Sequence, residues 1–226
     1  MVMRIGHRGA MGYEPENTLR SFRKALHMDC HMVELDVQRC RTGELVVFHD
    51  DTLERTTNGT GPVKQKSLEE LRTLDAGKGE QIPLLEEVLD AIHGKSRVNI
   101  ELKGLGTARP VAHLIERCRR EKGWQTEDFL VSSFDHEELS AFRKLDPETP
   151  VGILFKELPA GLFEFARYIR AFSFNPLFRI VEAELVDAAH KEGIRVFVWT
   201  VNEPEDIDRM KTLGVDGICS NYPDRI

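Results

Sequence analysis

Short apolar runs alternate with amphipathic segments along most of this 226-residue chain. Such runs are typical of buried strands, and the segments between them have the apolar spacing of helices. The predicted strands are residues 3–7, 32–37, 98–102, 129–132, 151–155, 171–174, 195–199 and 215–219. The predicted helices are residues 17–28, 84–93, 108–122, 135–145, 160–168, 181–191 and 203–213. Eight strands alternating with helices predict an α/β fold, a (β/α)8 TIM barrel, as a single domain over residues 1–226.

A ninth apolar run, residues 45–49, does not fit this alternation. Its connection from Val37 is too short for a helical crossover, which needs about a dozen residues. We therefore predict a hairpin with a tight turn at Thr42-Gly43, which would place His49 opposite Asp36. Residues 51–83 would then form a small insertion over the barrel, with a helix-like stretch at 67–74.

The end of the chain leaves little room after the last predicted strand. Only residues 220–226 follow it, so no full eighth helix fits. We expect the groove between the first and seventh helices to be partly uncovered, or covered by a partner chain in a homodimer.

Charge and cysteine content bear on partners and location. The chain has 31 Lys and Arg against 38 Asp and Glu, a formal net charge of −7, and no basic stripe. Nucleic-acid binding and a stable membrane anchor are therefore not expected. The four cysteines show no CxxC spacing, and the N-terminus lacks an apolar signal-peptide core. These features predict free thiols and a cytoplasmic location.

Polar residues at strand ends carry the chemical signal, because barrel active sites lie at the C-terminal ends of the strands. Glu34 and Asp36 are two residues apart and so point the same way, and Glu101 and Lys103 repeat this spacing. Three converging acids would repel one another unless a cation neutralised them, and carboxylates suit Mg²⁺ or Ca²⁺, with Mn²⁺ as a further candidate. Arg8 and Lys103 would supply fixed positive charge for an oxyanion.

Each of these residues also has a structural interpretation. An isolated Glu-x-Asp pair is more often a solvated face or a salt-bridge partner, but two such pairs on adjacent apolar strands favour a ligand set. His7 alone could equally be a packed core histidine. Together with His49 at a second strand end it is better interpreted as half of an acid–base pair.

Residues 16–18 and Asn175 also have structural interpretations. Glu16 could lie at the pocket rim, whereas Asn17-Thr18 is explained by capping of the first helix. Asn175 fits a pocket residue and a turn before Pro176 equally well.

The order and spacing of these motifs closely resemble the glycerophosphodiester phosphodiesterase family over residues 6–223. The motifs are His7-Arg8-Gly9, Pro15-Glu16-Asn17-Thr18, Glu34-Leu35-Asp36-Val37, His49-Asp50, Arg55-Thr56-Thr57-Asn58-Gly59, Glu101-Leu102-Lys103, Ser133-Phe134, Trp199-Thr200-Val201-Asn202 and Asp216-Gly217-Ile218. This resemblance implies a metal-dependent hydrolase that splits a glycerophosphodiester into glycerol 3-phosphate and an alcohol.

The resemblance also implies roles for individual residues. Family members hold one divalent ion on the residues matching Glu34, Asp36 and Glu101. His7 and His49 would be the general acid and base, in an order that the residues do not decide, and Arg8 and Lys103 would contact the phosphate. Phe134 and Trp199 match aromatic positions that shape the pocket. The nucleophile is either water or the glycerol 2-hydroxyl, which would first form a cyclic phosphate.

Three alternatives are weighed against this interpretation. A lysophospholipase D-type or phospholipase C-like enzyme acting on longer lipids would need an apolar rim, whereas the insertion is mostly polar. A non-catalytic binding protein would be expected to have lost a histidine or a metal carboxylate, and this chain keeps all five. A barrel lyase or aldolase could use Lys103, but two histidines beside a metal suit phosphodiester cleavage better.

Overall fold

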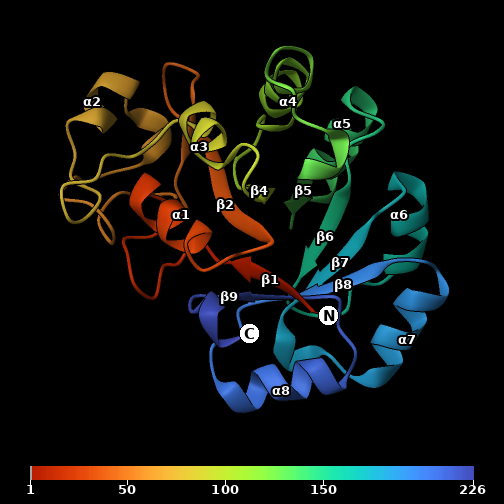
Figure 1. Cartoon of the computed structure of the whole chain (residues 1–226). Helices are drawn as coiled ribbons and strands as arrows, with labels where there is room; N and C mark the ends of the chain where they lie inside the picture. Colours follow the sequence, from red (N-terminus) through yellow and green to blue (C-terminus); the bar gives the residue numbers. More distant parts are fainter. Residues whose placement is uncertain (1) are drawn as a thin grey trace.

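The computed structural model describes residues 2–226 and contains a closed barrel of eight parallel strands surrounded by helices (Figure 1). The hydrogen-bonded order is β1-β9-β8-β7-β6-β5-β4-β2, and pairing of β1 with β2 closes the ring. A ninth strand, β3, pairs antiparallel with β2 outside the ring. The predicted TIM barrel is therefore confirmed.

The strands and helices follow the predicted order with small shifts at their ends. The strands are β1 (Met3–Gly6), β2 (Met32–Arg39), β3 (Leu45–Val47), β4 (Arg97–Leu102), β5 (Phe129–Ser133), β6 (Val151–Phe155), β7 (Ser173–Pro176), β8 (Arg195–Val198) and β9 (Gly217–Ser220). The helices are α1 (Leu19–Leu26), α2 (Leu68–Arg72), α3 (Leu85–Ile92), α4 (Ala108–Lys122), α5 (His136–Leu145), α6 (Leu162–Ile169), α7 (Ala183–Lys191) and α8 (Pro204–Thr212).

Alternation along the strands divides the core into two layers. Val33, Leu35 and Val37 of β2 belong to the large apolar cluster that also contains the buried helix residues. Residues of the opposite parity point into the barrel, where Ile5, Met32, Leu130, Phe197 and Cys219 form a separate apolar cluster. Because Glu34 and Asp36 share the parity of Met32, their carboxylates lie above this inner cluster.

The hairpin formed by β2 and β3 differs from the prediction by one residue. Val37 pairs with Val47, and the backbone N–H of Phe48 donates to the carbonyl of Asp36 at 2.9 Å. Phe48, rather than His49, is therefore opposite Asp36. The reason is a three-residue loop closed by Cys40 and Glu44, in which Gly43 has a φ of +102°, instead of a two-residue turn.

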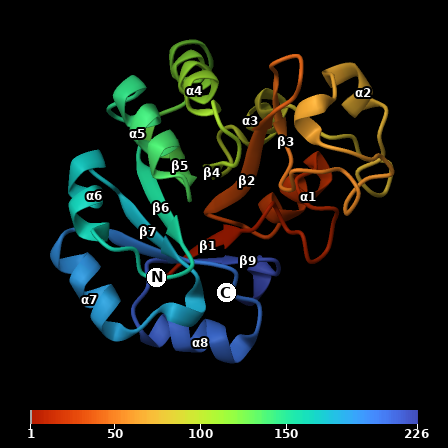
Figure 2. The ribbon, with the colours of Figure 1, turned by 180° about the vertical axis from the view of Figure 1, so that it is seen from behind.

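The insertion over residues 51–83 has an apolar cluster of its own. Leu53, Val63, Leu71 and Ile82 are buried there together with Val46 of β3 and with Phe48. Its helix α2 starts with a capping box between Ser67 and Glu70. Figures 1 and 2 both show the insertion beside α1 and α3, next to the hairpin.

A single 3₁₀ turn, Pro223–Arg225, follows β9 where a barrel would have its last helix. Arg4 donates to the carbonyl of Ile226 at 3.2 Å, and the hydroxyl of Tyr13 donates to Asp224 at 2.9 Å. The tail thus fills part of the groove that the sequence predicts to be uncovered. No helix within residues 2–226 is long and apolar enough to cross a membrane.

Candidate active site

Three carboxylates converge at the C-terminal ends of two neighbouring strands. Glu34 and Asp36 lie on β2, and the strand register places Asp36 directly beside Glu101 of β4. One oxygen from each of the three acids lies within 4.8 Å of the other two. All three side chains are buried, with Asp36 only 1% exposed.

This arrangement is electrostatically unfavourable for the protein alone. Burial, reinforced by the charge of Asp36, raises the pKa of Glu34 well above its usual value. The same two causes raise the pKa of Glu101 from 4.5 to about 7, although the nearby Lys103 opposes the shift. Oε1 of Glu101 is buried, and the ammonium of Lys103 lies 3.1 Å from it as an ion pair. Three buried carboxylates whose oxygens lie this close together form a donor set that fits a hard divalent cation.

The first β–α loop folds back onto this cluster. The backbone N–H of Arg8 donates to Glu34 at 2.9 Å, and Nε of Arg8 lies 3.2 Å from Oδ2 of Asp36. Asn17 donates from Nδ2 to the same Asp36 oxygen at 2.9 Å. The interpretation of Asn17 as part of a helix cap is therefore wrong. Thr18 alone caps α1, by accepting from the N–H of Ser21, which leaves the Asn17 side chain to face the acids.

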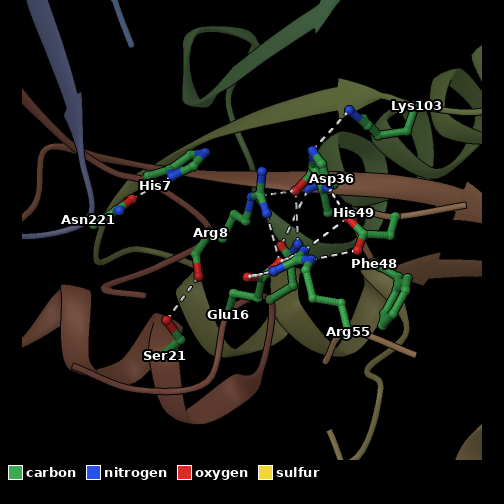
Figure 3. A network of polar contacts seen from close by, with 12 residues as sticks. His7, Arg8, Glu16, Ser21, Asp36, Phe48, His49, Arg55, Lys103 and Asn221 are labelled. Atoms are coloured by element: carbon green, nitrogen blue, oxygen red, sulfur yellow. Dashed lines mark hydrogen bonds and ion pairs between the residues drawn. The ribbon is translucent and has the colours of Figure 1, made fainter. Parts of the chain in front are cut away.

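The two histidines have different partners. Nδ1 of His7 lies 2.7 Å from Oδ1 of Asn221, and the pKa of His7 is lowered from 6.5 to about 4, first by burial and then by the charge of Arg8. Nδ1 of His49 lies 2.5 Å from Oδ1 of Asp50, and its Nε2 lies 3.2 Å from Nζ of Lys103. Figure 3 shows His7 with Asn221 on one side of Arg8, and His49 with Lys103 on the other.

The loop that carries His49 is held by a buried amide. Nε2 of Gln38 donates to the carbonyls of Phe48, His49 and Asp50 at 3.1, 3.2 and 2.7 Å. The two N–H groups of this amide are shared among three carbonyls, and this fixes the backbone on which the histidine sits. His49 therefore reaches the site from just beyond the end of β3.

The far side of the site is aromatic and also carries a second lysine. The rings of Phe134 and Trp199 meet edge to face at 5.5 Å, and Nε1 of Trp199 donates to the carbonyl of Asn175 at 2.7 Å. Lys103 and Lys156 place their Nζ atoms 5.9 and 5.6 Å from the centre of the Phe134 ring.

These groups open into one cavity at the mouth of the barrel. Eight of the nine site residues predicted from the sequence line it, and Asp36 lies beneath. The lining residues among the predicted set are His7, Arg8, Glu34, His49, Glu101, Lys103, Phe134 and Trp199. Asn175 also lines the cavity, which favours its interpretation as a pocket residue.

Comparison with known proteins places this site in a family. Residues 7–225 match the model of the glycerophosphoryl diester phosphodiesterase family. The chain belongs to this family. A glycerophosphodiester phosphodiesterase from Caldanaerobacter subterraneus is 38% identical over 98% of this chain and 95% of the relative. One from Bacillus altitudinis is also 38% identical, over 100% of this chain and 96% of the relative.

Solved structures of this family have the same fold. A phosphodiesterase from Oleispira antarctica, in complex with its product sn-glycerol-3-phosphate, superposes with a TM-score of 0.92 at 30% identity. The match covers 99% of this chain and 94% of that one. As a member of the glycerophosphoryl diester phosphodiesterase family, the chain is an enzyme that hydrolyses phosphoric diesters.

Several contacts of this site have no role assigned from the sequence. Asn221 and Gln38 are polar residues next to strand ends, yet only the fold shows that they hold His7 and the His49 loop. Lys156 directly follows β6, and that position at a barrel strand end is the signal that could have identified it. Glu16 and Arg55 occur in the family motifs, and the structure joins them by two hydrogen bonds of 2.8 Å.

Proposed function

We propose that this enzyme hydrolyses glycerophosphodiesters to glycerol 3-phosphate and an alcohol, using a divalent cation and two histidines. The observation that carries the proposal is the meeting of three buried acids, two histidines and two basic side chains at one cavity. The match to the family, and the similarity to a phosphodiesterase that holds sn-glycerol-3-phosphate, support glycerophosphodiesters as the substrate class.

Glu34, Asp36 and Glu101 would hold the cation, either Mg²⁺, Ca²⁺ or Mn²⁺. When bound, such an ion would offset most of the negative charge of the three acids and polarise a phosphate oxygen. The backbone N–H of Arg8 and the amide of Asn17 already donate to Glu34 and Asp36 and so hold these two carboxylates in place.

Arg8 and Lys103 would bind the non-bridging phosphate oxygens. A phosphodiester carries one negative charge, and in-line attack gathers more charge on these oxygens. Both basic groups line the cavity next to the acids, with Nζ of Lys103 3.1 Å from Oε1 of Glu101. Lys156 at the mouth adds positive charge that would attract the anionic substrate.

His7 is proposed as the general base. The Asn221 oxygen accepts a hydrogen bond from the N–H at Nδ1, so Nε2 of the neutral ring is left to take a proton from the nucleophile. The lowered pKa of His7, caused mainly by burial, keeps the ring neutral at pH 7. This role is the same whether the nucleophile is water or the glycerol 2-hydroxyl.

His49 is proposed as the general acid. Its Nδ1 contacts the carboxylate of Asp50, which can balance the charge of an imidazolium as the amide of Asn221 cannot. Nε2 would give its proton to the leaving alkoxide once the Lys103 ammonium, which lies 3.2 Å from it without substrate, has turned to the phosphate. Two titratable rings with opposite surroundings are the pattern expected for an acid and a base.

A release assay tests the proposed function directly. Glycerol 3-phosphate should appear from glycerophosphocholine, glycerophosphoethanolamine and glycerophosphoglycerol, and a metal chelator should abolish its release. Turnover that survives complete chelation would contradict the cation. A clear preference for lysophosphatidylcholine over these small diesters would instead favour the lysophospholipase D-type alternative.

A change of leaving group separates the two histidines. A glycerophospho-p-nitrophenyl ester needs little help from an acid, because p-nitrophenolate leaves without a proton. His49→Ala should therefore keep much of its activity on this ester and lose it on glycerophosphocholine, whereas His7→Ala should lose both. The opposite pattern would exchange the two assignments.

Four inferences from the sequence remain predictions alongside this proposal. They are the single catalytic domain over residues 1–226, the cytoplasmic location, the absence of nucleic-acid binding and the homodimer. The four cysteines are buried and form no disulfide, which agrees with free thiols.

A further inference from the structure

Arg55 is an arginine of the insertion that binds two carboxylates at once. Its Nε and Nη2 donate to the two oxygens of Asp50 at 2.6 and 2.9 Å. Its Nη1 and Nη2 donate to the two oxygens of Glu16 at 2.8 Å each. Four of the five N–H bonds of the guanidinium are used in this double fork.

Each of these two acids holds a different active-site side chain. Asp50 contacts Nδ1 of His49, and Glu16 accepts from Nη1 of Arg8 at 2.7 Å. A continuous path therefore runs from His49 through Asp50, Arg55 and Glu16 to Arg8. Figure 3 labels all of these residues except Asp50. The path connects the end of the hairpin with the loop after β1.

The members of this path differ in their access to the cavity. His49 and Arg8 line it, whereas Asp50, Arg55 and Glu16 do not. Arg55 therefore has no place in contact with a substrate, and any effect on the reaction must pass through its two acids. Without the guanidinium, two neighbouring carboxylates would repel each other, and each could turn away from the side chain that it holds.

Arg55 also has a purely structural interpretation. Its side chain is 48% exposed, and exposed ion pairs contribute little to stability. It could simply fasten the insertion to the barrel. Arg41 is such a fastener, because it is 57% exposed and pairs with Glu70 of the insertion at 3.0 Å without contacting the site. It provides a matched control.

We propose that Arg55 is a positioning residue that fixes the ring of His49 relative to the guanidinium of Arg8. This inference rests on the proposed function, in which His49 handles the proton of the leaving group and Arg8 binds the phosphate. The insertion then completes the active site by contributing the one side chain that joins the two groups.

Kinetics of two arginine variants provide the first test. Misplacing a catalytic group by about 1 Å can lower the rate about 100-fold, so Arg55→Ala should lower kcat by about 30- to 100-fold on glycerophosphocholine. Arg55→Lys should restore little, because an ammonium group cannot fork onto two carboxylates. Added guanidinium at millimolar concentration should restore part of the kcat of Arg55→Ala. Arg41→Ala should keep the wild-type kcat.

A double-mutant cycle tests whether Arg55 joins the two acids. Glu16→Gln and Asp50→Asn should be strongly non-additive in kcat/KM while Arg55 is present, because either change opens the same path. In the Arg55→Ala background their effects should multiply. The inference would be overturned if the effects of Glu16→Gln and Asp50→Asn on kcat/KM multiplied equally well with Arg55 present and in the Arg55→Ala background.

A readout without turnover separates this inference from the proposed function. The short His49–Asp50 contact should give a downfield imidazole N–H signal in the proton NMR spectrum of the wild type and of Arg41→Ala, and the signal should be lost in folded Arg55→Ala. Wild-type protein that releases no glycerol 3-phosphate would defeat the proposed function. Arg55→Ala with wild-type kcat and an unchanged signal would defeat the positioning role.

Discussion

Nδ1 of His7 lies 2.7 Å from Oδ1 of Asn221, a contact that joins the ends of the first and last strands of the barrel. The two residues are 214 positions apart in the chain. Because the partner is an amide, the ring gains no neighbouring negative charge from this contact. Burial and Arg8 therefore dominate, and the pKa of His7 stays near 4.

Asn221→Asp should change the pH dependence of the reaction. A carboxylate at this distance favours the charged imidazolium and typically raises the pKa of a neighbouring histidine by 1–3 units. The acidic limb of kcat/KM should then move to higher pH by about 1–2 units, because a base must be unprotonated to act. The profile is measured at saturating metal, with a metal titration at each pH. An unmoved limb would mean that His7 is not the base.

Glu34→Gln should stabilise the metal-free protein at alkaline pH. A carboxyl group whose pKa is raised on folding contributes stability at low pH that is lost as the pH rises through its folded-state pKa. Glu101, with its pKa raised from 4.5 to about 7, and Glu34 both belong to this class. At pH 8, above the pKa of Glu101, repulsion within the cluster is larger than at low pH, and removal of the Glu34 carboxylate should raise the free energy of unfolding by about 1–3 kcal/mol.

Chemical denaturation with and without metal checks this expectation. The increase in the free energy of unfolding that Glu34→Gln produces should become smaller toward pH 5. Added Mg²⁺, Ca²⁺ or Mn²⁺ should stabilise the wild type far more than the variant. Glu69→Gln, an exposed change on α2, serves as control. A carboxylate metal site would be contradicted if the variant were less stable than the wild type at pH 8. It would also be contradicted if added metal stabilised the variant as much as the wild type.

Alternation along the strands explains why the acids and the basic residues were predictable. A period of two fixes which side of a strand faces the barrel, so Glu34 and Asp36 had to point the same way, and strand adjacency then brought Glu101 to them. This reasoning needs no knowledge of side-chain partners. It does not reach Phe134 and Trp199, whose roles come from the resemblance to the family.

Partners of these residues were not predictable in the same way. Whether Asn17 caps a helix or donates to Asp36 depends on how the loop after β1 folds back, and no periodicity records that. The predicted register of the hairpin was wrong for a related reason. The same sequence fits a turn of two residues or of three. Only the hydrogen bond from the N–H of Cys40 to the carbonyl of Glu44 decides that Phe48 is opposite Asp36.

Deletion of residues 224–226 should destabilise the fold and leave the chemistry nearly intact. The deletion removes the contacts of Asp224 with Tyr13 and of Arg225 with the carbonyl of Asn202, at a cost of about 1–3 kcal/mol in the free energy of unfolding. Asn221 stays in place because its N–H donates to Asn202 at 2.9 Å and its carbonyl accepts from Gly12 at 3.0 Å. kcat should remain within about threefold of the wild type.

Thermal unfolding and sedimentation together check the role of this tail. A tail that fills the groove between α1 and α8 by itself predicts the same oligomeric state before and after the deletion. A dimer that dissociates on deletion would support the partner-covered groove instead. An unchanged melting temperature would show that the tail contributes nothing to the barrel.

Lys156→Gln should weaken substrate binding in a salt-dependent way. Lys156 lies 5.6 Å from the Phe134 ring at the mouth of the cavity and forms no ion pair within the described residues, so its charge is free to act on an incoming phosphodiester. An exposed charge contributes about 1 kcal/mol or less, so KM should rise by about two- to fivefold at low ionic strength, with kcat almost unchanged. The difference should fade near 0.5 M salt, where the screening length falls to a few ångströms. Lys144→Gln, an exposed change on α5, should have no effect at either salt concentration. A loss in kcat, or a rise in KM that persists at high salt, would place Lys156 in direct contact with the reacting group rather than at the entrance.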